Sequence, residues 1–376
     1  MKISVLQENI SKALLYVNRA VSSRPNIPVL ANVLIEADKG KIKLSATNLE
    51  VGIATWIGAE VTEAGQLTVS AKLLSEFVTS LKKGKVEMSA TDQMFEVNFV
   101  DNKAQFFVIP AEDFPKVPEA EGDILMEVNA FKLADAIALT SFSAGMDESR
   151  PVLTGVLVTA KQNKLTLVGV DGFRLSKKDL LLEKEIKQEE FKEIIPAKSL
   201  MEVEKLIREV ADDKSLVKVY YLGAKNQILF KVEDIEFSTR LIEGDFPPFE
   251  KIIPIDSQIK FDVSHEEMSN MIKIVSIFAR NVIGNKTRFS LSADEQKLSL
   301  SANVVDIGKN ESKIEVKNLI GDDFETGFNI KFLTDMISAI KSKEIHFESN
   351  GPTAPGVFLN PDDKDYIHII MPMRLD

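Results

Sequence analysis

The sequence predicts an α+β protein of three repeated domains, each with two helices packed on antiparallel strands. The main observation is a strand-like run that occurs three times, at 41–48, 164–171 and 297–303. These runs end at Asn48, Asp171 and Asn303, which are 123 and 132 residues apart. The period is that of a whole domain, because solenoid repeats recur every ~20 to 50 residues. The length of 376 residues agrees, since a single core stops growing near ~250 to 300 residues.

A second segment repeats in the same register and opens a run with helical spacing each time. Its three copies are Ser70-Ala71-Lys72-Leu73-Leu74, Pro196-Ala197-Lys198-Ser199-Leu200 and Asn329-Ile330-Lys331-Phe332-Leu333. A third segment, Asp113-Phe114-Pro115 and Asp245-Phe246-Pro247, occurs only twice, where one domain would lead into the next. With charged or proline-rich junctions at 118–123 and 247–257, we predict domains at 1–121, 122–252 and 253–376.

The individual elements follow from hydrophobic periodicity. Six amphipathic helices are predicted at Gln7–Arg24, Lys72–Lys83, Asn129–Phe142, Lys198–Val210, Ser264–Arg280 and Asn329–Lys343. The fifth helix begins with a capping-box pattern at Ser264–Glu267. Alternation of apolar and polar residues predicts strands that include Lys41–Ala46, Val86–Ala90 and Phe95–Val100.

Composition limits the class of protein. The chain has no cysteine, which excludes disulfides, thiolate metal sites and a cysteine nucleophile. A polar start and the lack of a long apolar run predict a cytoplasmic protein. The net charge of −11 argues against a nucleic-acid partner. However, the six predicted helices hold 15 Lys and Arg against 9 Asp and Glu, which leaves −17 elsewhere. Helices that simply expose lysine would explain the same division.

Motifs for catalysis are weak. Gly284-Asn285-Lys286-Thr287 lacks the upstream glycine of a phosphate loop and is interpreted as a turn. His265, His346 and His368 lack metal-ligand spacing. The cluster Asp362, Asp363 and Asp365 fits an acidic turn, and a metal-dependent phosphoryl-transfer enzyme is the alternative that it leaves open. We therefore expect no catalytic site, metal or cofactor.

The C-terminal run Tyr366–Leu375 closely resembles the end of the bacterial DNA polymerase III β subunit, the sliding-clamp family. Further segments match landmarks of that family in the same order, and the resemblance spans essentially the full chain. These segments are Arg24–Leu30, Arg150–Gly155, Asp171–Leu175 and Asp245–Pro247.

The resemblance implies a homodimer of head-to-tail subunits that close into a ring of six domains. Twelve helices would line the hole and sheets would form the outside, so that a basic lining surrounds duplex DNA without reading its sequence. The residues expected to contact DNA are Arg24, Lys72, Arg150 and Lys198, with Lys12 and Arg19 added from their helix. Each of them could also be an ordinary solvated charge.

The resemblance also implies a groove that binds short peptides of the replicative polymerase, the clamp loader and repair proteins. The matching residues are Leu153, Val170, Gly172, Phe173, Arg174, Leu175, Pro247, Lys251, Ile252, Ile369, Met371, Pro372, Met373, Arg374 and Leu375. Met371 and Met373 could instead be core residues at a chain end. Val170 and Phe173 replace polar residues that are common in the family, and Asp376 follows the usual final leucine, so a shifted peptide preference is expected.

The subunit contact is expected between Phe106 and Val108 of the first domain and Ile277 and Phe278 of the third. Apolar residues at this spacing could also belong to the cores of those domains. The main rival to the clamp hypothesis is a three-domain interaction scaffold that never binds nucleic acid.

Overall fold

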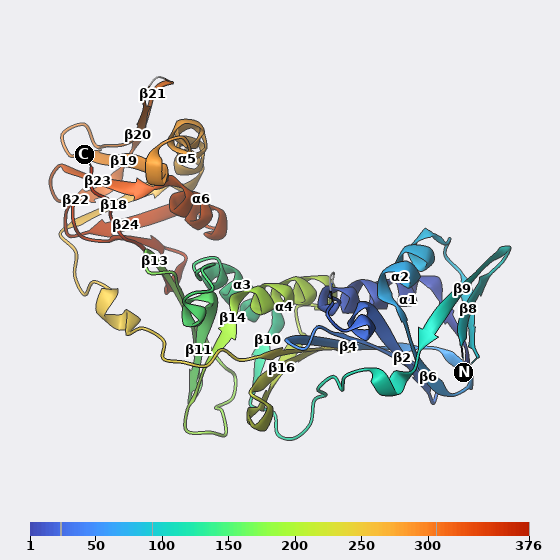
Figure 1. The fold of residues 1–376 in the computed structure, drawn as a ribbon. Coiled ribbons are helices and arrows are strands. Elements are labelled where there is room, and N and C mark those ends of the chain that lie inside the picture. The colour runs from blue at the N-terminus through green and yellow to red at the C-terminus, as the bar shows by residue number, and fades with distance from the viewer. Residues whose placement is uncertain (23–24, 92, 306, 376) are drawn as a thin grey trace. The chain divides into compact units, whose positions relative to one another are not determined.

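The computed structural model describes residues 1–22, 25–91, 93–305 and 307–375. Within these ranges the chain forms six α-helices and 26 β-strands in three sheets (Figure 1). The strand pairs of these sheets are antiparallel. The predicted α+β class is therefore confirmed. No helix in the described ranges is both long and apolar enough to cross a membrane.

The chain divides into two compact units. Unit 1 comprises Met1–Ala134, Leu182–Gln188 and Glu202–Leu241, and unit 2 comprises Asp135–Leu181, Glu189–Met201 and Ile242–Asp376. This division differs from the three predicted domains because strands pair across both predicted boundaries. In unit 1, β17 pairs with β4, and in unit 2, β13 pairs with β26. The two predicted domain boundaries remain a prediction.

Unit 1 contains one thirteen-stranded sheet in the order β10-β15-β16-β17-β4-β3-β2-β6-β9-β8-β7-β1-β5. Its strands are β1 Lys2–Leu6, β2 Asn32–Asp38, β3 Lys41–Thr47, β4 Val51–Gly58, β5 Glu60–Glu63, β6 Gly65–Ser70, β7 Lys85–Ala90, β8 Met94–Phe99, β9 Asn102–Ile109, β10 Met126–Asn129, β15 Leu216–Leu222, β16 Gln227–Val232 and β17 Ile235–Arg240. The three strands predicted by alternation are confirmed as β3, β7 and β8.

Unit 2 contains a nine-stranded sheet, β14-β11-β12-β13-β26-β25-β24-β18-β22, and a four-stranded sheet, β21-β20-β19-β23. Their strands are β11 Gly155–Lys161, β12 Lys164–Val170, β13 Arg174–Leu181, β14 Phe191–Pro196, β18 Ile259–Ser264, β19 Lys286–Ser292, β20 Lys297–Val304, β21 Gly308–Glu315, β22 Lys317–Ile320, β23 Phe324–Asn329, β24 Glu344–Ser349, β25 Gly356–Asn360 and β26 Asp363–Ile370.

The repeats in sequence correspond to repeated structure. The three strand-like runs form β3, β12 and β20, each paired with the strands that precede and follow it in the chain. Each helix begins directly after a strand. The helices are α1 Gln7–Val17, α2 Ala71–Ser80, α3 Ala130–Ser141, α4 Ala197–Val210, α5 His265–Ala279 and α6 Ile330–Ala339.

Three of the helices end at least three residues earlier than the sequence predicted, and α3 and α5 end one residue earlier. The helix α1 ends at Val17, α2 at Ser80 and α6 at Ala339. Within their observed bounds the six helices hold 8 Lys and Arg against 9 Asp and Glu. The predicted basic surplus of the helices is therefore wrong. The extra cations follow the helix C-termini, where positive charge complements the helix dipole.

The buried stripes of α5 and α6 agree with the periodicity. Met268, Met271, Ile272 and Val275 of α5 are buried, as are Leu333, Met336 and Ile337 of α6. They join one hydrophobic core with the phenylalanines of the neighbouring strands. Ser264 caps α5 by accepting a hydrogen bond from the amide of Glu267, which confirms the predicted helix start at Ser264.

Candidate functional site

The strand pair β13 and β26 is the centre of the candidate site. Their register places Arg174 opposite Ile370, Leu175 opposite Ile369 and Ser176 opposite His368. Side chains alternate between the two faces of a strand. Leu175 and Ile369 therefore lie on one face, and the residues before and after them lie on the other.

The face of Leu175 and Ile369 carries a buried apolar cluster, here called the junction cluster. Its buried members are Leu157, Val168, Val170, Leu175, Ile194, Phe249, Val357 and Ile369, with Val152, Ile242, Phe246, Ile253, Leu359 and Ile367 packed against them. Three predicted groove residues, Val170, Leu175 and Ile369, belong to it. Sequence reasoning did not place the other members in the groove, and among them Phe246, Phe249 and Ile253 lie in a proline-rich segment without periodicity.

A hairpin turn at 171–174 joins β12 to β13 beside this cluster. The amide of Phe173 donates to Asp171 Oδ1 at 2.8 Å, and the amide of Met371 donates to the carbonyl of Phe173 at 2.8 Å. Gly172 has a φ of 94°, a conformation that favours glycine. Phe173 itself is 60% exposed. The turn therefore presents a large aromatic side chain on a backbone that is held from two sides.

The remaining predicted groove residues are spread over several segments. Leu153 is buried, Pro247 is half-buried, and Lys251, Ile252 and Met371 are exposed. The tail then turns to the four-stranded sheet: the amide of Met373 donates to the carbonyl of Gly327, and Lys286 Nζ donates to the carbonyl of Arg374. Pro372 and Leu375 are half-buried, and Asp376 lies outside the described residues.

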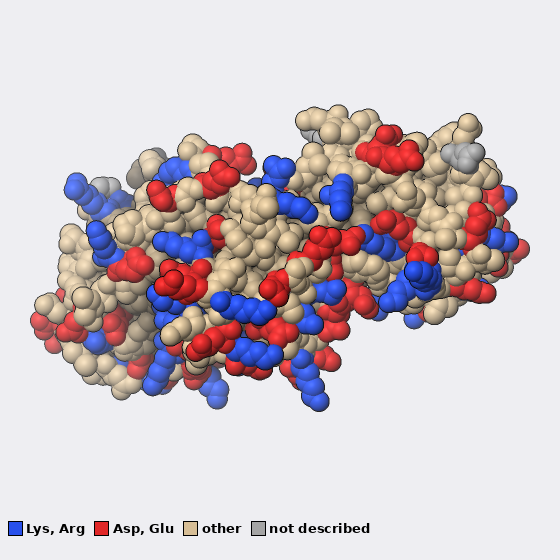
Figure 2. All heavy atoms as spheres, turned by 90° about the horizontal axis from the view of Figure 1, so that it is seen from below, with Lys and Arg blue, Asp and Glu red and all other residues tan. Residues whose placement is uncertain are grey.

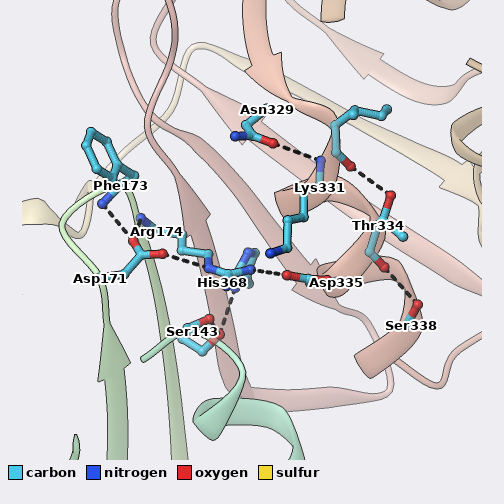
Figure 3. Close-up of polar contacts among 12 residues, drawn as sticks. Ser143, Asp171, Phe173, Arg174, Asn329, Lys331, Thr334, Asp335, Ser338 and His368 are labelled. Atoms are coloured by element: carbon cyan, nitrogen blue, oxygen red, sulfur yellow. Dashed lines mark hydrogen bonds and ion pairs between the residues drawn. The ribbon is translucent and has the colours of Figure 1, made fainter. Parts of the chain in front are cut away.

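Arg174 lies with its side chain on the opposite face from Leu175, so only its backbone borders the junction cluster. The side chain is 6% exposed. Its Nε donates to Asp171 Oδ2 at 3.0 Å and its Nη1 to Asp335 Oδ2 at 2.6 Å (Figure 3). Asp335 belongs to α6, and its role could not be inferred from its position in the sequence.

A buried polar network continues along this face from Arg174. His368 Nδ1 lies 2.7 Å from Ser176 Oγ, which lies 2.7 Å from Ser143 Oγ. Burial, with a smaller contribution from the charge of Arg174, lowers the pKa of His368 to about 3. Burial likewise raises the pKa of Tyr366. Both groups are therefore neutral near pH 7. The strand pair carries buried polar side chains on the face of Arg174 and apolar side chains on the face of Leu175.

The residues predicted to contact DNA differ in their surroundings. Lys12, Lys72 and Lys198 are exposed, and Arg150 is exposed beside Asp147 at 3.6 Å. Arg19 is partly buried between Glu202 and Glu209, at 3.7 and 2.6 Å, so carboxylates already neutralise it. Arg24 lies outside the described residues.

The repeated lysine has the same place in three helices. Lys72, Lys198 and Lys331 are each the second residue of a helix, in α2, α4 and α6, and each is exposed. The helix dipole disfavours cations at this end, while the free amides there favour an anion. Packing and the helix dipole therefore do not favour three lysines at this position, although Lys72 also lies 3.9 Å from Glu76 in its own helix.

Elsewhere on the surface the charges are mixed. Figure 2 shows acidic and basic side chains interspersed over the face that it draws.

Asp363 accepts a hydrogen bond from Lys178, and the described residues contain no group of three His, Cys, Asp or Glu that could hold a metal ion. His265 and His346 are hydrogen-bonded to Ile337 and to Asp262 respectively.

The four residues predicted at a subunit contact are not equally exposed. Phe106 packs edge-on against Phe77 at 6.0 Å, and Phe278 packs against the core of unit 2. Val108 is half-buried and Ile277 is 65% exposed. Sequence reasoning missed Phe107, which is 84% exposed because it points to the other face of β9 from Phe106.

Family models match nearly the whole chain. They describe the N-terminal, central and C-terminal domains of the DNA polymerase III beta subunit and match residues 1–118, 127–248 and 250–374. The beta sliding clamp of Synechococcus elongatus is 27% identical over 378 residues, with 100% of both chains covered.

Solved structures give the same result. The DNA polymerase sliding clamp of Bacillus subtilis is 25% identical with a TM-score of 0.93, and 100% of both chains is covered. A sliding clamp of Pseudomonas aeruginosa bound to griselimycin has the same identity, coverage and TM-score.

Proposed function

This chain belongs to the family of DNA polymerase III beta subunits, and on that premise we propose that two copies close head to tail into a ring around duplex DNA. It is a DNA sliding clamp, a processivity factor without a catalytic site of its own. The polymerase and other partner proteins would be held near their template through short peptides. Its place of action would be the cytoplasm, where the DNA to be copied lies.

The observation that carries the DNA-binding part is the lysine at the second position of α2, α4 and α6. A lysine beside free helix amides can contact a phosphate without reading a base. Such contacts release counterions, so the direct affinity falls with salt. Retention on DNA would therefore depend on encirclement, and weak contacts would allow sliding.

A retention assay tests encirclement. With a clamp loader supplied, the protein should remain on nicked circular DNA and be lost from the same DNA after linearisation, because a ring can leave a linear molecule at its ends. Equal loss from both molecules would overturn the proposal and favour the interaction scaffold. A solution mass near that of one chain, 41.8 kDa, at micromolar concentration would also contradict the ring.

The lysines can be tested through the salt dependence of direct DNA binding. In a ring of two chains, replacing Lys72 and Lys198 together by alanine removes four lysines and should reduce the slope of log affinity against log salt by up to about 3.6, since each phosphate contact contributes about 0.9. Lys39→Ala is the matched control, because Lys39 is exposed on the β2–β3 turn. An unchanged slope in the double variant would remove these two residues from the DNA contact.

For partner binding, we infer that the junction cluster and the exposed Phe173 and Met371 form the predicted groove. Griselimycin, the ligand in the Pseudomonas aeruginosa structure, is a suitable probe. Deleting residues 371–376 should abolish griselimycin binding while the protein still dimerises. Unchanged affinity after the deletion would refute the assignment of the tail to the groove.

A further inference from the structure

We propose that Asp335 of α6 is a positioning residue for the predicted groove, because through Arg174 it fixes the turn that presents Phe173. The inference rests on the proposed peptide-binding function. It adds a residue on a helix, on the other face of the sheet from the junction cluster, that none of the sequence patterns indicated.

The first link is the carboxylate of Asp171. Its Oδ1 accepts hydrogen bonds from the amides of Phe173 at 2.8 Å and Arg174 at 2.9 Å. Its Oδ2 accepts from Arg174 Nε at 3.0 Å. One carboxylate therefore holds both the backbone of the turn and the side chain that follows it (Figure 3).

The second link is the guanidinium of Arg174, which connects the turn to α6. Its Nη1 donates to Asp335 Oδ2 at 2.6 Å, and its Cζ lies 4.6 Å from the centre of the Phe332 ring. Phe142 lies 5.5 Å away. A charge buried to this extent needs a partner with good geometry, so Arg174 has little freedom while both carboxylates are present.

The repeat provides an internal comparison for the turn. In the first repeat, Asn48 Oδ1 accepts from the amides of Glu50 at 3.0 Å and Val51 at 2.7 Å. Leu49 has a positive φ of 76°, as Gly172 has. A neutral asparagine holds the same turn together with Thr47, whose Oγ1 accepts from the amide of Leu49 at 3.0 Å and donates to the carbonyl of Val51 at 2.8 Å. Val51 occupies the position of Arg174, and Thr47 that of Val170. The second turn therefore has an ion pair to a helix where the first turn has a local hydroxyl.

The ion pair has a function if Phe173 binds a ligand. A large aromatic side chain that is exposed and held rigidly loses less conformational entropy on binding, and such residues supply much of the affinity at interfaces. The carbonyl of Phe173 is bound to the amide of Met371, so displacement of the turn would also move the tail. By linkage, a ligand that fixes Phe173 should in turn stabilise the contact of Arg174 with α6.

The test begins with Asp335→Asn in the full-length chain, which preserves shape and removes one charge. Ser338→Ala is the control on the same helix, and Glu266→Gln is the control for loss of one charge on α5; both residues are exposed. Hydrogen exchange of the Phe173 and Arg174 amides should become faster in Asp335→Asn and should keep its wild-type rate in the two control variants. The Glu50 and Val51 amides of the first repeat should keep their rates in all variants.

Affinity for griselimycin, measured by calorimetry, then tests the consequence. Asp335→Asn should weaken binding about 3- to 10-fold, a range that corresponds to coupling between neighbouring residues. In a Phe173→Ala background the same change should weaken binding by less than about twofold, because the residue that it positions is gone.

Two results would overturn the inference: unchanged exchange at 173–174, or an equal loss of affinity with and without Phe173. An equal loss would mean that Asp335 acts only on general stability. If exchange becomes faster in Asp335→Asn but the wild-type protein does not bind griselimycin, the link from α6 to the turn stands and the groove is rejected. The failure of the proposed function can therefore be distinguished from the failure of this inference.

Discussion

Two equivalent turns of the repeat, 48–51 and 171–174, have the same backbone pattern but different side-chain partners. The turns follow the equivalent strands β3 and β12. In both turns the side chain of the first residue accepts hydrogen bonds from two backbone amides. In the first turn this residue is Asn48, which is neutral. In the second it is Asp171, whose second oxygen binds Arg174 and so connects the turn to α6. The comparison teaches that a repeat can keep a turn while one added charge joins it to another element.

The largest expected effect comes from removing the cation of the second turn. Arg174→Met should destabilise unit 2 by about 3–5 kcal/mol, because the partly buried carboxylates of Asp171 and Asp335 would lose their cationic partner. Urea unfolding followed by circular dichroism measures the loss. Lys177→Met on the other face of β13 is the control and should cost less than about 1 kcal/mol, because its pair with Asp179 is less buried. Equal losses would show that the ion pairs of Arg174 contribute no more to the free energy of unfolding than the exposed pair of Lys177.

Acid should weaken the second turn before the first. The pKa of His368 is lowered from 6.5 to about 3 in the folded chain, so the unfolded chain binds a proton more readily. The stabilisation is complete above pH 6.5 and is lost as the pH falls toward 3, by roughly 2 kcal/mol at pH 5. Hydrogen exchange of 171–176 against 48–51 between pH 7 and pH 5 measures the difference.

His368→Gln is the variant that assigns this acid effect. Glutamine can keep a hydrogen bond to Ser176 but does not titrate, so the increase in exchange at the second turn between pH 7 and pH 5 should be smaller in the variant than in the wild type. The same pH dependence in the variant and the wild type would mean that another group causes it.

The first residues of the two turns, Asp171 and Asn48, can each be replaced by the other residue type. Asp171→Asn should keep the turn, since an amide oxygen still accepts both backbone amides, but should cost about 1.5 kcal/mol from the charge-assisted bond to Arg174. Asn48→Asp should change stability by less than about 0.5 kcal/mol, because no cation follows it at Val51. Thermal unfolding of both variants is the measurement, and equal effects would make the turns equivalent in energy as well as in backbone.

The smallest effect is expected at Ser143, which precedes the second turn in the chain. Ser143→Ala removes one end of the hydrogen-bonded series Ser143, Ser176 and His368 and should cost about 1 kcal/mol. Griselimycin affinity should not change, because the turn and Phe173 keep their partners. Ser338→Ala, at an exposed site, is the control for stability. A larger loss of stability in Ser143→Ala than in Asp171→Asn would show that the buried hydroxyls stabilise the second repeat more than the charge of Asp171 does.

Much of the fold could be predicted from the sequence because it depends on local periodicity. The repeated strand runs became β3, β12 and β20, and the repeated lysine became the second residue of α2, α4 and α6. Helix C-termini were less predictable. The amphipathic pattern of α1, α2 and α6 continues into residues that the backbone places beyond the last helical turn, so their cations were wrongly counted as helical.

The sequence alone determined the family resemblance, the repeat and the apolar residues Val170, Leu175 and Ile369, since all of these are patterns along one chain. Only the tertiary structure decided that Arg174 turns away from Leu175 and meets Asp335, 161 residues later. Strand alternation separates neighbours onto opposite faces, and a buried cation then pairs with whichever carboxylate the packing of α6 brings to it. Such a partner depends on three-dimensional packing and has no fixed spacing in sequence.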